Sequence, residues 1–361
     1  MMRLSRPGWS GGVCGRELSR RTFLSTMAAL ALTRVEDPTF AQGPARSARP
    51  PLIDVHHHIF PPAFLAAARD AFKSPESRAR LVAGWTPQQA LTQMDEHGVA
   101  FAITSITNPG IWFGNVQAAR SLARACNEYA AQLARDYPSR FGFFAAVPLP
   151  DTDGGLREID YAFEVLKADG VSLLTSYGDK WPGDSAYTRV FEELNRRKAV
   201  VFFHPTAPTC CQNLVANVPD ALTEFPHDTT RAVSSLLYSG AFARFREIHF
   251  IFANAGGTIP MLAGRMVQTG GALFGLDKNV ANGVEYELRR LHYEIANSTS
   301  RSAMSALMNL VPTSQILFGT DYPFVPTPVT ADALLTLGLS AEDVRTIGRG
   351  NAVDLFPRLR G

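Results

Sequence analysis

The chain has few cysteines, no marked excess of either charge and no long apolar run, and each shortage excludes a class of protein. Four cysteines in 361 residues are too few for a disulfide-stabilised scaffold. The 35 basic and 33 acidic side chains nearly cancel, and many of the surplus arginines fall in the first fifty residues. The nearly neutral remainder argues against nucleic acid as the main partner. The apolar stretch Phe23–Leu32 is too short to span a bilayer of roughly 30 Å, so we expect no stable membrane insertion.

The amino-terminal residues have the layout of an export signal. Arg20 and Arg21 precede the apolar stretch Phe23–Leu32, and a small-residue site near Ala41 follows it. This order is typical of a cleaved signal peptide, and the paired arginines resemble the twin-arginine type. We therefore predict a signal peptide over residues 1–41, a linker over 42–50, export to the periplasm and one folded domain over 51–361. A disordered basic arm is the alternative for the first segment.

Apolar runs separated by amphipathic stretches predict an α/β fold, and a hydrophobic share of 46% excludes wholesale disorder. Eight short runs are apolar on both faces, which is typical of strands buried on both sides. They are Leu52–His58, Ala100–Ile106, Phe141–Leu149, Val171–Ser176, Val200–Thr206, Ile248–Asn254, Leu291–Asn297 and Ile316–Asp321. Between them, residues 116–137, 156–168 and 187–198 place apolar side chains at helical spacing.

This alternation of strands and helices predicts a single-domain (β/α)8 TIM barrel after the signal peptide. An open doubly wound sheet is the competing topology. The first run is not followed by Gly-x-Gly-x-x-Gly, which weakens a dinucleotide-binding version of that sheet.

Polar residues gather where the predicted strands end, which is where such barrels carry their chemistry. His56 and His58 are two residues apart and therefore face the same side of the first strand. His204 ends the fifth strand because the proline that follows cannot donate to a sheet. Asp321 ends a very apolar run, where burying a carboxylate is costly unless it meets a cation. The sequence therefore predicts that these four residues bind a divalent metal at the barrel axis.

The motifs that carry these residues resemble the amidohydrolase superfamily. They are Leu-Ile-Asp-Val-His-His-His, Phe-His-Pro, Ala-Gly-Gly-Thr-Ile-Pro and Phe-Gly-Thr-Asp-Tyr-Pro-Phe, in family order from about residue 51 onward. The chain is most similar to the branch typified by aminocarboxymuconate-semialdehyde decarboxylase, near the 6-methylsalicylate decarboxylase-like proteins. The resemblance implies that His56, His58, His204 and Asp321 bind one ion, with zinc as the usual metal and manganese as the alternative. Strand 171–176 contains no lysine of the kind that binuclear members carboxylate.

The resemblance also implies roles for other residues. The typified decarboxylase has a histidine as base or proton carrier where this chain has Asn254, whose carboxamide does not titrate near neutral pH. Asn254 is therefore expected to position substrate or water. Proton transfer then falls to Asp321 alone or to His227, which we place in the loop after the fifth strand; an ordinary surface-loop residue is the alternative.

Two further residues are candidates for substrate binding. Arg265 matches an arginine that binds a substrate carboxylate across a subunit boundary, which favours a homodimer; an exposed helix arginine is the alternative. Trp112, after the second strand, is a candidate aromatic wall for a planar substrate, with ordinary loop packing as the alternative.

Two reactions suit such a site. In the first, the enzyme is a non-oxidative decarboxylase of a small aromatic or unsaturated carboxylic acid, in which the metal polarises the carboxylate and Asp321 transfers the proton. In the second, it is a hydrolase of an amide, ester or lactone that uses metal-activated water with Asp321 as base. A barrel that binds a metal or a carboxylated ligand without turnover is the third reading. Whole-chain similarity favours decarboxylation.

Overall fold

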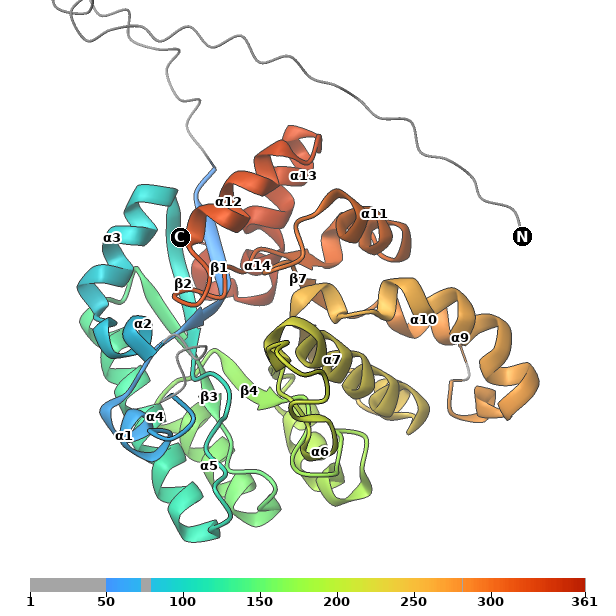
Figure 1. Cartoon of the computed structure of the whole chain (residues 1–361), viewed down its shortest axis with the longest axis horizontal. Helices are drawn as coiled ribbons and strands as arrows, with labels where there is room; N and C mark the ends of the chain where they lie inside the picture. The colour runs from blue at the N-terminus through green and yellow to red at the C-terminus, as the bar shows by residue number, and fades with distance from the viewer. Residues whose placement is uncertain (1–49, 73–78, 281, 361) are drawn as a thin grey trace, which may run out of the picture. The chain divides into compact units, whose positions relative to one another are not determined.

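The chain folds as a parallel barrel of eight strands surrounded by helices (Figure 1). The computed structural model describes residues 50–72, 79–280 and 282–360, which fall in one compact unit. The strands pair in the order of the chain: β1 (Leu52–His58), β2 (Val99–Ser105), β3 (Phe141–Ala146), β4 (Gly170–Leu174), β5 (Val200–His204), β6 (His249–Phe252), β7 (His292–Glu294) and β8 (Ile316–Leu317). The predicted signal peptide (1–41) and all but the last residue of the predicted linker (42–50) lie outside the described residues.

Hydrogen bonds link β1 to the segment after β8 and bring the sheet round into a nearly closed barrel. Val55 N donates to Phe318 O at 3.0 Å, and Asp321 N donates to His56 O at 2.7 Å. The first and last strands of an open doubly wound sheet would not meet in this way. The predicted TIM barrel is therefore confirmed, and the open-sheet alternative is wrong.

Helices alternate with the strands and form an outer ring (Figure 1). They are α1 (Pro62–Ala67), α2 (Ala79–Gly84), α3 (Pro87–His97), α4 (Val116–Asp136), α5 (Thr152–Glu164), α6 (Thr188–Arg196), α7 (Asp220–Tyr238), α8 (Ala241–Arg244), α9 (Ile259–Phe274), α10 (Val284–Leu288), α11 (Arg301–Leu310), α12 (Thr327–Thr336), α13 (Ala341–Arg345) and α14 (Asn351–Leu355). Within the described ranges, none of them combines the length and apolarity needed to cross a membrane.

The predicted helices at 116–137 and 187–198 match α4 and α6 closely, but α5 begins earlier than the predicted 156–168. Its first turn contains Gly154 and Gly155, which are poor helix formers. Gly155 packs so closely that a Cβ there would lie 3.1 Å from Val147. This close contact favours glycine at position 155 although glycine is a poor helix former.

The apolar side chains form two layers, one inside the barrel and one between strands and helices. The inner cluster takes alternate strand residues and includes Ile53, Val55, Ile103, Phe144, Phe202, Ile251 and Leu317. The larger outer cluster contains intervening strand residues, such as Phe203 and Phe252, together with the inward faces of the helices. Both faces of each strand are thus buried, which explains the continuous apolar runs in the sequence.

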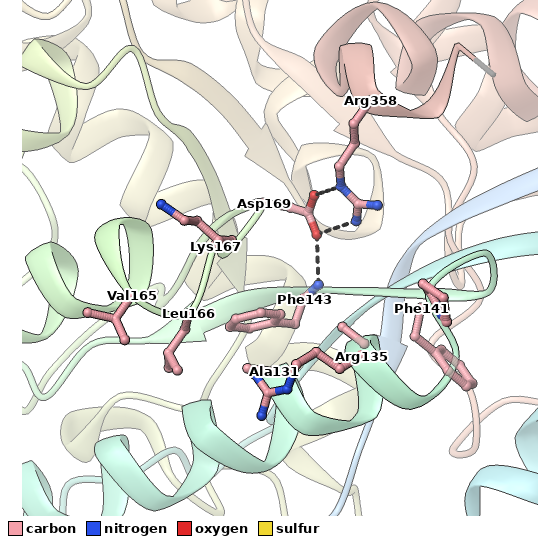
Figure 2. Close-up of a pocket in the computed structure, with 11 residues that line it drawn as sticks. Ala131, Arg135, Phe141, Phe143, Val165, Leu166, Lys167, Asp169 and Arg358 are labelled. Carbon is pink, nitrogen blue, oxygen red and sulfur yellow. Dashed lines mark hydrogen bonds and ion pairs between the residues drawn. The ribbon is translucent and has the colours of Figure 1, made fainter.

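The amino ends of β3 and β4 carry a cavity of about 470 Å³ whose lining includes an ion pair between Arg358 and Asp169 (Figure 2). Arg358 Nη2 donates to Asp169 Oδ2 at 2.7 Å, and the same oxygen accepts from Phe143 N at 2.9 Å. These bonds tie the carboxyl-terminal segment to the barrel wall. In such barrels this end serves stability, and the chemistry lies at the opposite end.

Candidate metal centre

Three imidazoles and one carboxylate converge at the carboxyl ends of the strands. His56 and His58 come from β1, His204 ends β5, and Asp321 follows β8. Each offers one ligand atom, and these atoms all lie within 4.8 Å of one another. The histidines are buried, whereas the Asp321 side chain is 17% exposed and so reaches the open end of the barrel. The structure therefore brings together the four residues predicted from the sequence.

The spacing of these atoms fits a metal ion. His58 Nε2 lies 3.2 Å from His56 Nε2, 3.3 Å from His204 Nε2 and 3.1 Å from Asp321 Oδ1. Tetrahedral zinc with ligand distances of 2.0–2.1 Å separates its ligand atoms by about 3.3 Å. His58 Nε2 therefore lies from each of the other three ligand atoms at about the separation that one tetrahedral ion requires, and all four atoms lie within 4.8 Å of one another.

The other nitrogen of each imidazole is bound to an acceptor that cannot donate. Nδ1 of His56 lies 2.9 Å from Glu294 Oε1, that of His204 lies 2.8 Å from a backbone carbonyl, and that of His58 lies 3.3 Å from Ser105 O. Each Nδ1 must therefore carry the proton. In the neutral form of each ring this leaves the lone pair on Nε2 to bind a metal.

Asp54 explains why β1 presents His56 and His58 inward. Its Oδ1 accepts from His56 N and Thr320 N at 3.0 Å each, and its Oδ2 accepts from His57 Nδ1 at 3.0 Å and Thr320 Oγ1 at 2.6 Å. One buried carboxylate thus fixes the backbone of β1, the outward-facing His57 and the segment that leads to Asp321. The ligands from the two ends of the domain are held in register by this residue.

Glu294, on β7, is a functional residue that the sequence reasoning missed. It is fully buried, and its Oε1 accepts from Asn254 N at 2.7 Å as well as facing His56 Nδ1. Its Oε2 accepts from Ala296 N at 2.6 Å. A carboxylate behind a metal-binding histidine fixes the orientation of the ring and raises its basicity. The signal was an acidic residue inside the apolar run Leu291–Asn297, the same argument that identified Asp321.

Burial and neighbouring charges shift the pKa values of three residues of the cluster. Burial lowers the pKa of His56, but the negative charges of Glu294 and Asp321 outweigh this and raise the pKa to about 9. Burial raises the pKa of Asp321, yet the charge of His56 and the bond with His58 hold it below its usual value. Burial and the neighbouring imidazoles lower the pKa of His204 well below its ordinary value. The negative charges of Glu294 and Asp321 thus favour a positive charge in this buried site.

Asn254 lies beside this network at the end of β6. Its Nδ2 donates to Ala296 O at 3.0 Å, and its backbone N–H is bound to Glu294. Its Oδ1 is shielded from solvent and accepts no hydrogen bond in the described part of the chain. The Asn254 side chain is therefore held beside Glu294, the carboxylate that supports His56, and its Oδ1 is available to accept a hydrogen bond.

The four clustered ligands do not include the remaining predicted residues. His227 was predicted to lie in a loop, but it lies within α7, where its side chain is exposed. The neighbouring Asp228 is buried in hydrogen bonds with Thr175 and Trp181, and these contacts stabilise the helix in this segment. Arg265 is exposed on α9. Trp112 lines a separate cavity of about 370 Å³ near the ends of β2 and β4.

The barrel and its three-histidine, one-aspartate cluster define a metal-dependent enzyme whose chemistry lies at the carboxyl ends of the strands. The amidohydrolase family profile matches residues 53–358. The 6-methylsalicylic acid decarboxylase of Penicillium expansum is 35% identical over 323 residues, covering 86% of this chain and 97% of the relative. Decarboxylase yanB of Aspergillus niger is 35% identical over 328 residues, covering 85% and 88%.

The fold also matches a solved structure, a dihydroxybenzoic acid decarboxylase from Polaromonas with bound manganese and the inhibitor 2-nitroresorcinol. The TM-score is 0.75 at 20% identity, covering 86% of this chain and 98% of the other. The chain belongs to the amidohydrolase family. Within it, the chain falls in the decarboxylase branch and is a metal-dependent carboxy-lyase.

Proposed function

We propose that this carboxy-lyase removes CO2 from a small hydroxylated aromatic acid similar to 6-methylsalicylate. The substrate class is supported by the name of the Penicillium expansum relative, of which this chain covers 97%. The observation that carries the proposal is the placement of Asp321. Its Oδ1 lies among the imidazoles, and its Oδ2 accepts a hydrogen bond from the exposed Asn297 at 2.9 Å. One carboxylate thus reaches both the metal position and the open end of the site.

In the proposed reaction the chain holds the ion and Asp321 carries the proton. When bound, the ion supplies positive charge that withdraws electron density from the substrate carboxylate and a neighbouring oxygen. His56, His58 and His204 would hold it through Nε2, together with Asp321. Asp321 takes a proton from solvent at the open end of the site and passes it to the ring carbon that bears the carboxylate. The bond to that carboxylate then breaks, its electrons return to the ring and CO2 leaves. General acid–base catalysis of this kind contributes about 10²–10⁴-fold.

The other predicted site residues take positioning roles. Asn254 would orient substrate or water through its unused acceptor, because a carboxamide does not titrate near neutral pH. Trp112 would contribute an aromatic wall at the edge of the site. His227, exposed on α7, stays the alternative to Asp321 as proton carrier.

A homodimer is part of the proposal, with Arg265 of one subunit binding the substrate carboxylate of the other. It is supported by α9, whose apolar side chains Met261, Leu273 and Phe274 are 75%, 71% and 68% exposed. Large apolar side chains that are this exposed on one helix are candidates for burial against a second subunit. Sedimentation of the wild-type enzyme as a monomer at assay concentration would contradict this arrangement.

We propose zinc as the ion, with manganese as the alternative. Three nitrogens and one oxygen suit zinc. The manganese bound in the Polaromonas relative supports the alternative. Reconstitution of metal-stripped enzyme with each ion, followed by metal analysis and turnover measurement, distinguishes the two.

We propose export to the periplasm by a twin-arginine signal, on the strength of Arg20 and Arg21 before the apolar stretch Phe23–Leu32. Cell fractionation of the wild type and of a variant with both arginines changed to lysine tests this. The wild type should appear in the periplasm in a shortened form, and the variant should remain in the cytoplasm at full length.

The activity itself is tested with metal-loaded enzyme and two substrate panels. Hydroxybenzoates, including 6-methylsalicylate, should release CO2 and give the corresponding phenol. Aryl esters and lactones should remain intact. Ester or lactone hydrolysis without CO2 release would overturn the proposal in favour of a hydrolase.

A further inference from the structure

Asn297 and Asp321 form a hydrogen-bonded pair at the ends of the neighbouring strands β7 and β8. Asn297 Nδ2 donates to Asp321 Oδ2 at 2.9 Å, whereas Asp321 Oδ1 lies 3.1 Å from His58 Nε2. The two oxygens of one carboxylate therefore have different surroundings. Oδ1 belongs to the metal centre, and Oδ2 is the oxygen on the side of the exposed Asn297.

The backbone holds both residues in an unusual conformation. Asn297 has φ of +59° and Asp321 has φ of +63°, in the left-handed region that most side chains avoid but Asn and Asp tolerate. Asn254, at the end of β6, has φ of +55°. Non-glycine residues in this region concentrate at functional sites, where the surrounding structure holds them. Three successive strands thus end in a left-handed Asn or Asp, and two of these side chains meet over the metal centre.

We propose that Asn297 is a positioning residue that selects Oδ2 of Asp321 for proton transfer to the substrate. The inference rests on the proposed function, in which Asp321 carries the proton. The amide occupies one lone pair of Oδ2 and resists rotation of the carboxylate. The second lone pair takes a proton from solvent and delivers it to the ring carbon, so the O–H bond breaks, a C–H bond forms and the bond to the leaving CO2 gives its electrons to the ring. Without the amide, the carboxylate spends less time in the aligned orientation.

Two substitutions test this without adding backbone strain. Asn297→Gly removes the amide and suits a positive φ. Asn297→Asp keeps the shape but replaces the donor with an acceptor facing Asp321. Since hydrogen bonds to charged groups are strong, kcat should fall about tenfold in the first and up to about a hundredfold in the second. KM should change less than about threefold, because the amide acts on proton delivery and not on substrate binding.

Three further readouts separate positioning from general damage. Metal content should match that of the wild type, and calorimetric binding of 2-nitroresorcinol should be unchanged. The solvent deuterium isotope effect on kcat should rise, because proton transfer then limits turnover more fully. Asn217→Gly and Asn217→Asp are matched controls, because Asn217 is an exposed asparagine with φ of +64°. They should leave kcat and the isotope effect at wild-type values.

The inference is overturned by any of three results. These are kcat within twofold of the wild type in both Asn297 variants, an isotope effect that does not change, or metal content that falls in parallel with kcat. Failure of the proposed function shows itself differently, as wild-type enzyme that is fully metal-loaded yet releases no CO2 from any aromatic acid. That result would remove the inference as well.

Discussion

Replacing Glu294 with glutamine should weaken metal binding although Glu294 is not a ligand. The carboxylate is fully buried and accepts from His56 Nδ1, Asn254 N and Ala296 N at 2.9, 2.7 and 2.6 Å. Glutamine has the same shape but only one oxygen, so its NH2 must face at least one of these donors. A lost buried hydrogen bond of this kind costs about 1–3 kcal/mol in the free energy of unfolding.

Loss of the negative charge also leaves His56 less basic and less well oriented. Supporting residues of this kind typically alter metal affinity 10- to 100-fold, which corresponds to about 1.4–2.8 kcal/mol. The assay is competition for the metal against a chelator of known affinity, on wild-type protein and Glu294→Gln, at one pH. Urea unfolding of the metal-free proteins gives the change in stability separately.

Glu158→Gln is the matched control for this experiment. Glu158 is a nearly buried carboxylate on α5, outside the barrel, that accepts from Arg124 Nη2 and Asn127 Nδ2 at 2.9 Å each. Its glutamine variant should lose stability but keep wild-type metal affinity. The reasoning is refuted if Glu294→Gln binds metal within threefold of the wild type, or if Glu158→Gln weakens metal binding equally.

Three further predictions concern the ligands and the pH dependence. His204→Ala should abolish metal binding and turnover together, and retained activity with a full metal complement would refute that ligand assignment. Removing the metal with a chelator should abolish CO2 release, and adding back zinc or manganese should restore it; activity that survives complete removal would contradict the mechanism. The pKa of His292 is lowered to about 4, because burial disfavours the charged ring and His249 adds repulsion. As the pH falls below about 6.5, the unfolded chain therefore takes up a proton at His292 that the folded protein does not. The free energy of unfolding should fall by about 2 kcal/mol from this group between pH 7 and pH 5. His292→Gln should show a smaller loss in urea unfolding over this interval, and an equal loss would show that His292 is not responsible.

Much of the ligand set could be predicted because each ligand has a local signal. His56 and His58 share a face through the two-residue period of a strand, a proline marks His204 as the end of β5, and Asp321 ends an apolar run. None of these signals depends on knowing which strands are neighbours. The barrel then brings the strand ends together at one face.

The misplaced and missed residues depend on contacts between distant segments. His227 was predicted to lie in the loop after the fifth strand, but this segment lies in α7, where Asp228 is buried against Thr175 and Trp181. Asn297 is an ordinary strand-end residue in the sequence. Only the proximity of β7 and β8 places its amide against Asp321.

The sequence alone therefore determined the barrel and the four metal ligands, because burial on both strand faces and polar residues at strand ends leave periodic local marks. The tertiary structure decided which carboxylate supports His56 and which amide contacts Asp321. Those outcomes are hydrogen bonds between residues up to 238 positions apart. These hydrogen bonds depend on strand pairing and backbone conformation, which no local sequence pattern predicts.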